Sequence, residues 1–300
     1  MKTFVEYLRD CKVEDGLLTV LESLRDSVIA IAAAVRTTGT GKAGTQNVFG
    51  EDQLAIDVVS NNIVEDTLRK NVFVGLIASE EMPDEVKIGD GEYAVCFDPL
   101  DGSSLIDVNL AVGSIFGIYK TSTFLGVRGR DQLAAIVAVY GPRTTIILTV
   151  GNGVVEFILN DEGKFVLCKS DIKVGDGKMF APGNLRACKS RKEYLELVNY
   201  WCNEQYTLRY SGGMVPDINQ ILLKGKGIFA YPGFSDEPNG KLRLLFECAP
   251  MSLIMEQAGG ESSDGAGAIL DKVVDSLDQR TPIFIGSRAE VSRCREFLSG

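Results

Sequence analysis

The feature that most constrains the fold is a long apolar stripe with helical spacing, followed by short continuous apolar runs. Apolar residues recur every three or four positions from Leu17 to Val35, which places them on one face of an amphipathic helix. The runs at residues 72–78 and 93–97 are typical of buried strands. Helices and strands mix without a strict βαβ order, so the sequence predicts a layered α/β fold and not a simple doubly wound sheet.

The remaining elements are predicted from the same two periodicities. Further strands are expected at residues 114–119, 144–150, 154–159 and 228–231. Further helices are expected at residues 51–70, 132–139, 192–205, 253–258 and 288–298. The glycine-rich residues 37–44 are expected to end the first helix and to form a mobile loop. Composition shifts near residues 170–177, and we therefore expect two packed subdomains, residues 1–172 and 173–300.

The chain contains no histidine, and 31 Lys and Arg against 41 Asp and Glu give it a formal net charge of −10. The absence of imidazole excludes Ser-His-Asp and Cys-His hydrolysis and most zinc centres. The acidic balance argues against a nucleic-acid partner. The longest apolar stretch, residues 28–35, is far shorter than the roughly 20 residues that span a bilayer. Seven cysteines without a CxxC pair are typical of reduced thiols, so we expect a cytoplasmic protein with no membrane partner.

The segment at residues 97–104, FDPLDGSS, begins with two acids placed to converge. We expect a strand to deliver Asp98 and Pro99 to end its pairing, so that Asp101 aims its carboxylate at the same point. Two carboxylates and a backbone carbonyl are oxygen ligands, which select hard cations such as Mg²⁺ or Mn²⁺. An Asx-type turn with solvated acids is the alternative explanation.

The rest of this segment has the properties of a phosphate site. Gly102 allows a ligand to approach the backbone closely. Ser103 and Ser104 offer N–H and hydroxyl donors that suit a phosphate, especially if they begin a helix. The segment therefore predicts a phosphate beside an oxygen-ligated cation.

Two further groups of acids precede this segment. Glu80 and Glu81 follow the strand predicted at residues 72–78, and adjacent carboxylates there point to opposite faces. One of them can bind a metal while the other orients or deprotonates a water, although a solvated strand end is the alternative. Glu51 stands at the start of a predicted helix, where acids favour the helix dipole. Asp57 is harder to explain in that way, because its neighbours are apolar.

Basic residues alternate with leucines at residues 241–247, KLRLLFE. Glu247 lies in this apolar stretch, and a buried glutamate needs a partner or a metal. If the segment is a strand, Lys241 and Arg243 share one face and can hold a phosphate; a salt-bridged edge strand is an equal alternative. Arg209 adds a basic residue before a glycine turn. Together these groups are typical of two-metal phosphate ester hydrolysis, which needs no imidazole.

The chain resembles the sugar bisphosphatases of the fructose-1,6-bisphosphatase superfamily over nearly its full length. The matching segments are residues 50–57, 79–81, 97–104, 115–119, 209–214, 241–247 and 258–260. Within the superfamily, the sedoheptulose-1,7-bisphosphatases are more similar to it at residues 140–145, 181–187, 212–220 and 262–265. The resemblance implies an α/β/α/β/α layered fold, with an N-terminal metal-binding subdomain and a C-terminal sugar-phosphate-binding subdomain.

The resemblance also implies roles for individual residues. Metal ligation is implied for Glu51, Glu80, Asp98, Leu100 through its carbonyl, Asp101 and Glu247. Activation of the nucleophilic water is implied for Glu81 paired with Asp57. Contact with the phosphate that is cleaved is implied for Gly102, Ser103 and Ser104. Contact with the sugar and the other phosphate is implied for Asn184, Arg209, Tyr210, Met214, Tyr231, Lys241 and Arg243, with Arg209 reaching across from a neighbouring subunit.

Three departures from the family pattern bear on regulation and metal number. Thr40 and Thr45 stand where plastid enzymes carry a regulatory cysteine pair, so thioredoxin control is not expected. Glu92 stands where the AMP site of fructose enzymes has a lysine, and its carboxylate would repel a phosphate, so AMP inhibition is not expected. Glu51 stands where fructose enzymes usually have aspartate, which leaves either two or three metals per subunit.

The resemblance implies a Mg²⁺-dependent hydrolase, with Mn²⁺ as a substitute, that removes the 1-phosphate of sedoheptulose 1,7-bisphosphate. Fructose-1,6-bisphosphatase activity, alone or as a second activity, is the main alternative. A catalytically silent sugar-phosphate sensor is an alternative from another class, and the intact set of acids argues against it. The sedoheptulose-like segments and the altered AMP site favour a homodimer over a tetramer.

Overall fold

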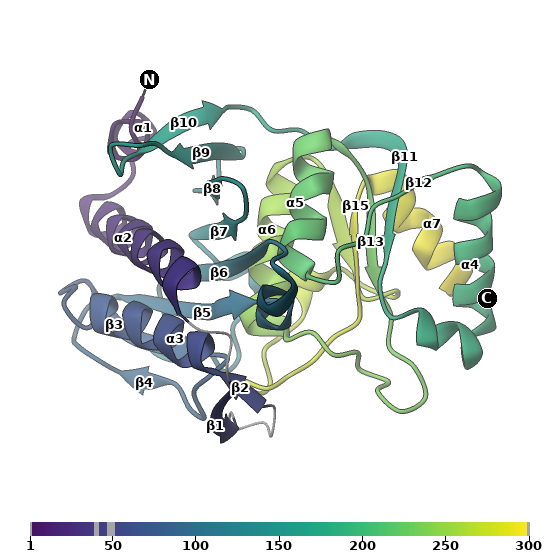
Figure 1. Cartoon of the computed structure of the whole chain (residues 1–300), viewed down its shortest axis with the longest axis horizontal. Helices are drawn as coiled ribbons and strands as arrows, with labels where there is room; N and C mark the ends of the chain where they lie inside the picture. The colour runs from purple at the N-terminus through teal and green to yellow at the C-terminus, as the bar shows by residue number, and fades with distance from the viewer. Residues whose placement is uncertain (1, 39–41, 47–51, 299–300) are drawn as a thin grey trace.

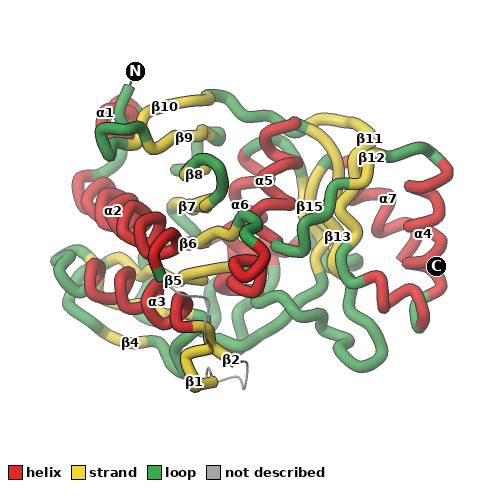
Figure 2. Tube along the Cα trace, viewed as in Figure 1, coloured by secondary structure: helices red, strands yellow, loops and turns green. Residues whose placement is uncertain are grey.

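The computed structural model describes residues 2–38, 42–46 and 52–298. Five layers stack across these residues in the order helix, sheet, helix, sheet, helix (Figure 1), and Figure 2 separates the helices from the strands by colour. The predicted layered α/β fold is therefore confirmed. Among the helices of the described residues, none combines the length and the apolar character that crossing a membrane requires.

An eight-stranded sheet forms the first strand layer, in the order β10-β9-β8-β7-β6-β5-β3-β4. Its strands are β3 (Val74–Ser79), β4 (Val86–Lys87), β5 (Tyr93–Asp101), β6 (Val112–Tyr119), β7 (Ala134–Tyr140), β8 (Thr144–Thr149), β9 (Val155–Leu159) and β10 (Phe165–Lys169). All neighbours are antiparallel except β3 and β5, which run parallel. Because their carboxyl ends meet at one edge, the acids that follow β3 lie near those at the end of β5.

Helices α2 (Asp15–Thr37) and α3 (Ala55–Leu68) cover one face of this sheet (Figure 1). The predicted stripe is confirmed, because Leu21, Leu24 and Val28 are fully buried in the core beneath α2. The short helix α1 (Phe4–Asp10) precedes them and was not predicted.

The segment between α2 and α3 differs from its prediction. Strand β1 (Lys42–Gln46) pairs with β2 (Asp52–Leu54), so the predicted loop is wrong from Lys42 onward and the predicted helix begins at Ala55. Glu51 and Thr40 lie outside the described residues, and so does the side chain of Thr45.

Residues 132–139 were predicted as a helix, but the structure places strand β7 there. The prediction was wrong because the run AAIVAVY is apolar on both faces, and periodicity does not separate a buried strand from a buried helix. Alternate residues of β7 face opposite cores: Ile136 contributes to the core under α2 and α3, and Val137 to the core that contains α5 and α6.

A five-stranded sheet forms the second strand layer, in the order β12-β11-β13-β15-β14. Its strands are β11 (Gly175–Pro182), β12 (Thr207–Leu208), β13 (Lys226–Tyr231), β14 (Glu261–Ser263) and β15 (Ile283–Gly286). The strand predicted at residues 228–231 is confirmed within β13, whereas the other four strands were not predicted.

Four helices sandwich this second sheet. Helices α5 (Met214–Lys224) and α6 (Ala249–Gln257) lie between the two sheets, and α4 (Lys192–Asn203) and α7 (Arg288–Leu298) cover the outer face (Figure 1). The helices predicted at residues 192–205, 253–258 and 288–298 are confirmed. Helix α5 was not predicted, and its N-terminus forms part of the site described next.

Candidate active site

A cavity of about 330 Å³ opens where the carboxyl ends of β3 and β5 face the N-terminus of α5. It is lined by Asp57, Glu80, Glu81, Asp98, Leu100, Asp101, Gly102, Ser103, Ser104, Tyr210, Gly212, Met214, Phe229, Tyr231, Lys241, Leu242 and Glu247. The structure therefore brings most of the predicted site residues to one cavity, although they come from segments far apart in the sequence.

The end of β5 has an irregular backbone that turns two acids toward the cavity. Asp98 is paired with Ile115 on β6 and Asp101 with Gly113, so the stretch from Asp98 to Asp101 holds one residue more than the partner strand. Such a bulge breaks the alternation of faces, and two residues three positions apart can then point the same way. Pro99 was expected to end the pairing, but β5 continues through Asp101.

Two hydroxyl groups hold this bulge from behind. The Ser114 hydroxyl donates to the carbonyl of Pro99 at 2.7 Å, and its oxygen lies 2.8 Å from the hydroxyl of Tyr140. All of these groups are buried, so water does not compete for them. Asp98 Oδ1 also accepts a hydrogen bond from the Leu100 N–H at 2.9 Å. The direction of the Asp98 carboxylate is thus fixed within the segment itself.

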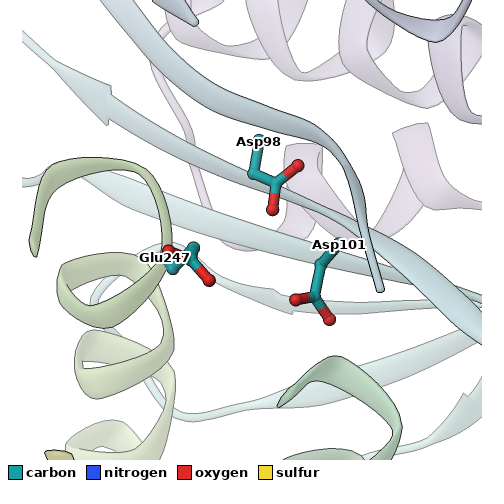
Figure 3. Close-up of side chains that lie close together, drawn as sticks. All are labelled: Asp98, Asp101 and Glu247. Carbon is teal, nitrogen blue, oxygen red and sulfur yellow. The ribbon is translucent and has the colours of Figure 1, made fainter. Parts of the chain in front are cut away.

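Asp98, Asp101 and Glu247 converge on one point (Figure 3). Each of the three offers a carboxylate oxygen within 4.8 Å of the other two, and none is more than 8% exposed. Glu247 comes from a short π-helix, η4 (Leu244–Cys248), at the start of α6. Residues 241–247 are therefore not the strand that the sequence analysis considered.

The pKa values of these acids reflect their crowding. Burial, followed by repulsion from Glu80 and the other two carboxylates, raises the pKa of Asp98 far above its usual range. Burial and repulsion from Glu80 and Asp101 likewise raise the pKa of Glu247. Burial raises the pKa of Asp101 to about 6, although the hydrogen bond from the Val215 N–H opposes the rise. Without a cation, this group of acids cannot be fully ionised at neutral pH.

This donor set fits a hard divalent cation. Three buried carboxylates supply only oxygen ligands, and the charge of a cation would offset the repulsion that raises their pKa values. Glu80 and Leu100 line the same cavity. Leu100 lies between Asp98 and Asp101 in the sequence, and Glu80 is close enough to Asp98 to raise its pKa. The residues that would hold a cation are thus Glu80, Asp98, Asp101 and Glu247, with the Leu100 carbonyl.

Arg243 lies among the acids and not on the cavity wall. Its side chain is 1% exposed, and Nε lies 3.6 Å from Oε1 of Glu80. Its backbone N–H donates to Oε2 of Glu247 at 2.5 Å. The idea that Lys241 and Arg243 share one face of a strand is wrong, because Lys241 is exposed and lines the cavity while Arg243 is buried.

Asp57 and Glu81 also line the cavity. Asp57 lies in the first turn of α3, where Oδ2 accepts a hydrogen bond from the Leu54 N–H at 2.9 Å. Burial raises the pKa of Asp57, while the bonds from Leu54 and the Ser103 side chain act against this rise. Glu81 follows β3, and its N–H donates to the Ser79 hydroxyl at 3.2 Å.

Glu80 and Glu81 were expected to point to opposite faces. Both line the cavity, because it opens at the end of β3 where the sheet no longer separates its two faces.

The predicted phosphate segment begins a short helix. Ser103 and Ser104 are the first residues of the 3-10 helix η1 (Ser103–Val108), and Gly102 before it has a φ of 76°, which favours glycine. Both serines and Gly102 line the cavity.

The other side of the cavity is formed by the second sheet and α5. Tyr210, Met214, Tyr231 and Lys241 line it as the resemblance implied. Asn184 lies behind this wall, where its Nδ2 donates to the Pro232 carbonyl at 2.9 Å.

Arg209 is exposed and is absent from the cavity lining, although the next residue, Tyr210, contributes to it. The sequence analysis missed Phe229 and Leu242, which line the cavity as ordinary apolar residues and carry no signal of their role. It also missed the Val215 N–H, which donates to Asp101 at 2.8 Å.

The fold and the cavity together define the class of sugar phosphatases with layered α/β architecture. Family models described as "Fructose-1-6-bisphosphatase, N-terminal domain" and "Fructose-1-6-bisphosphatase, C-terminal domain" match residues 3–170 and 174–299. The chain belongs to the fructose-1,6-bisphosphatase family of sugar bisphosphatases.

Relatives with two different names are about equally similar to this chain. The chloroplastic sedoheptulose-1,7-bisphosphatase of Triticum aestivum is 44% identical over 300 residues, which cover 98% of this chain and 76% of that protein. The class 1 fructose-1,6-bisphosphatase of Pelobacter propionicus is also 44% identical over 300 residues, covering 98% and 92%. The holo crystal structure of Leishmania major fructose-1,6-bisphosphatase matches with a TM-score of 0.94 and 33% identity, covering 99% of both chains.

Proposed function

We propose that this chain is a Mg²⁺-dependent sugar bisphosphatase that hydrolyses the 1-phosphate of sedoheptulose 1,7-bisphosphate to sedoheptulose 7-phosphate and phosphate. The observation that carries the proposal is the single cavity with an acid cluster and two serines on one wall and Tyr210, Tyr231 and Lys241 on the other. A bisphosphate needs two phosphate sites at a fixed separation, and these two walls provide groups for each. The wheat relative and the sedoheptulose-like segments support the seven-carbon sugar.

We assign the acid cluster to cation binding. Glu80, Asp98, Asp101 and Glu247, with the Leu100 carbonyl, would hold two ions, and Glu51 would complete a third site. Bound Mg²⁺, or Mn²⁺ in its place, would stabilise the negative charge that develops on the phosphate. Arg243 has a supporting role in this assignment, because it contacts both Glu80 and Glu247 and keeps them in place.

The chain's own residues supply the remaining steps. Gly102, Ser103 and Ser104 bind the phosphate that is cleaved, through the amide and hydroxyl donors at the start of η1. Glu81, with Asp57 beside it, takes a proton from the attacking water. The water oxygen bonds to phosphorus, and the bond from phosphorus to the C1 oxygen breaks. That oxygen takes up a proton from solvent and leaves as the sugar hydroxyl.

The second wall binds the sugar and the distal phosphate. Lys241 supplies a positive charge, and Tyr210 and Tyr231 supply hydroxyl groups and ring surface. Asn184 does not line the cavity, so the sugar contact that the resemblance implies for it stays a prediction; its buried Oδ1 has no hydrogen-bond partner among the described residues. Met214 places the first backbone amide of α5 at the same wall.

Fructose 1,6-bisphosphate is the second candidate substrate, because the bacterial relative of equal identity is named as a fructose-1,6-bisphosphatase. Steady-state kcat/KM for the two bisphosphates in Mg²⁺ decides between them. A strong preference for the six-carbon sugar would overturn the first assignment and leave the family unchanged.

The role of Glu81 is tested by Glu81→Gln, which keeps the shape of the side chain but removes the base. Turnover should be lost while binding of the bisphosphate, measured by calorimetry, remains. Glu162→Gln, on an exposed turn, is the matched control and should retain both. Unchanged turnover in the Glu81 variant would refute the assignment, and no turnover in the unmodified protein would favour a sugar-phosphate sensor.

We also propose a homodimer in which Arg209 serves the cavity of the neighbouring subunit. Arg209 is exposed and does not line its own cavity, and the exposed apolar residues Leu208 and Leu185 lie in the same part of the chain. Sedimentation velocity would measure the oligomeric state directly, with a tetramer as the alternative outcome. The cytoplasmic location expected from the sequence stays a prediction.

A further inference from the structure

The N-terminus of α5 is held from two sides at the cavity wall. On one side, Oδ2 of Asp101 accepts a hydrogen bond from the Val215 N–H at 2.8 Å. On the other side, the residues just before the helix supply Tyr210 and Gly212 to the cavity lining. The first turn of α5 therefore connects the acid cluster to the wall that we assign to the sugar.

A single buried carboxylate holds the segment that precedes α5. Asp217 is 1% exposed, and its carboxylate accepts the Ser211 N–H at 2.8 and 3.1 Å and the Gly212 N–H at 3.4 Å. The Gly213 N–H in turn donates to the Ser211 hydroxyl at 3.3 Å. Three successive amides are thus bonded either to Asp217 or to a residue that Asp217 holds.

Asp217 lies in the first turn of α5, where a negative charge favours the helix dipole, but its carboxylate bonds to the Ser211 and Gly212 amides that precede the helix. Burying a carboxylate costs free energy that its hydrogen bonds offset only in part, and an apolar residue could fill the same space. The left-handed backbone of Gly212, with a φ of 101°, also shows that this segment follows a path that few residues adopt. A charge-assisted set of hydrogen bonds can fix such a path, because these bonds are stronger than neutral ones.

We propose that Asp217 is a positioning residue that sets the affinity of the cavity for the sugar part of the substrate. It does not line the cavity and acts through the Ser211 and Gly212 amides, which place Tyr210 and Gly212 at the wall. Without the carboxylate, this segment would sample other paths, and substrate binding would have to order it again. The acid cluster keeps its own link to α5 through Val215. The inference rests on the proposed bisphosphatase function.

The test is the variant Asp217→Asn, which keeps the shape of the side chain but loses the charge and turns an NH₂ group toward the amides. KM is measured for whichever of the two bisphosphates the unmodified protein hydrolyses faster. We expect KM to rise by about tenfold, the effect of one weakened charge-assisted hydrogen bond, while kcat changes less than about threefold. The Mg²⁺ concentration at half-maximal rate should change much less than KM, because the ligands of the cation are not displaced and Asp217 acts on Asp101 only through its charge.

Glu290→Gln is the matched control. Glu290 is a buried acid in the first turn of α7, and its carboxylate accepts the Trp201 Nε1–H of α4 at 3.0 Å and the Tyr206 hydroxyl at 2.7 Å. It should lower thermal stability and leave KM unchanged. If Asp217→Asn does not fold, Ser211→Ala keeps the Ser211 N–H but removes the part-exposed hydroxyl that bonds to Asp217 and accepts the Gly213 N–H, and it should raise KM by a smaller factor.

Each outcome separates the inference from the function on which it rests. A rise in KM that is much larger than any change in kcat or in the Mg²⁺ concentration at half-maximal rate, and that is absent in the Glu290 control, supports the positioning role. An unchanged KM, or changes of equal size in KM, kcat and that Mg²⁺ concentration, overturns the role while the bisphosphatase function stands. Hydrolysis of neither bisphosphate by the unmodified protein overturns both.

Discussion

Replacing Asp101 by asparagine is expected to make the metal-free protein more stable at neutral pH and to remove its activity. Asp101 is buried, and burial raises its pKa from 3.8 to about 6. Because the folded protein holds this proton more tightly than the unfolded chain does, ionising the group at neutral pH costs stability. Asparagine has the same shape and no such cost, and its Oδ1 can still accept the Val215 N–H.

The magnitude and the pH range follow from the two pKa values. Each pH unit between them is worth about 1.36 kcal/mol, so the rise amounts to about 3 kcal/mol. A raised carboxyl pKa stabilises the fold fully below the unfolded value, and this contribution is lost as the pH rises through the folded value. The advantage of Asp101→Asn should therefore be absent below about pH 4, grow up to about pH 6 and stay constant above it.

Urea unfolding followed by circular dichroism, in EDTA from pH 4 to 8, measures the free energy of unfolding of both proteins. Asp161→Asn, on an exposed turn, is the control and should differ little from the unmodified protein at any pH. Added Mg²⁺ should stabilise the unmodified protein more than the Asp101 variant, because a ligand of the cation is missing. An Asp101 variant no more stable at pH 7, or equally more stable at every pH, would refute the reasoning.

Two substitutions test other parts of the site, and one added ligand tests regulation. Arg243→Lys keeps the charge but loses the planar guanidinium that contacts Glu80. The Mg²⁺ concentration at half-maximal rate should therefore rise by about 10- to 100-fold. An unchanged concentration would contradict the supporting role of Arg243. Ser114→Ala leaves the Pro99 carbonyl without its hydroxyl donor and should cost about 1 kcal/mol of unfolding free energy together with a lower kcat. AMP should not inhibit, because the resemblance aligns Glu92, which is ion-paired with Lys120 at 2.7 Å, with a lysine of the AMP site in fructose enzymes, and a carboxylate there would repel a phosphate. Inhibition by AMP in a steady-state assay would contradict this expectation.

The sequence predicted those elements in which the spacing or the type of the apolar residues points to a single kind of structure. The stripe of α2 faces one core and reads unambiguously as a helix, and the antiparallel strands β6, β8 and β9 were found as short apolar runs. Strand β7 is buried on both faces like β6, so alternation identifies neither of them, and β7 was misjudged because its run holds three alanines, which favour a helix. Helix α5 was missed because glycines precede it and a proline stands in its first turn, and both residues are signals of a turn.

The sequence also predicted which acids form the site, but not how they meet. Asp98 and Asp101 were placed together from their spacing, and Glu247 was singled out as a buried acid that needs a partner. Their convergence depends on contacts between segments about half the chain apart, which no local pattern encodes. Lys241 and Arg243 were thought to share one face because the leucine alternation resembles a strand, whereas the backbone there turns into a π-helix.

The irregular segments of the backbone carry the chemistry, and there is a physical reason for this. In a regular strand, residues three apart face opposite sides, so Asp98 and Asp101 would not meet without the extra residue that the bulge inserts. In the same way, the wider turn of a π-helix changes the direction of Glu247 relative to the helix that follows. Such distortions lose regular hydrogen bonds, and here Ser114 and the backbone N–H of Arg243 supply replacements. The groups next to the acids therefore hold the backbone in the shape that lets the acids converge, and substitutions there should weaken catalysis without touching substrate.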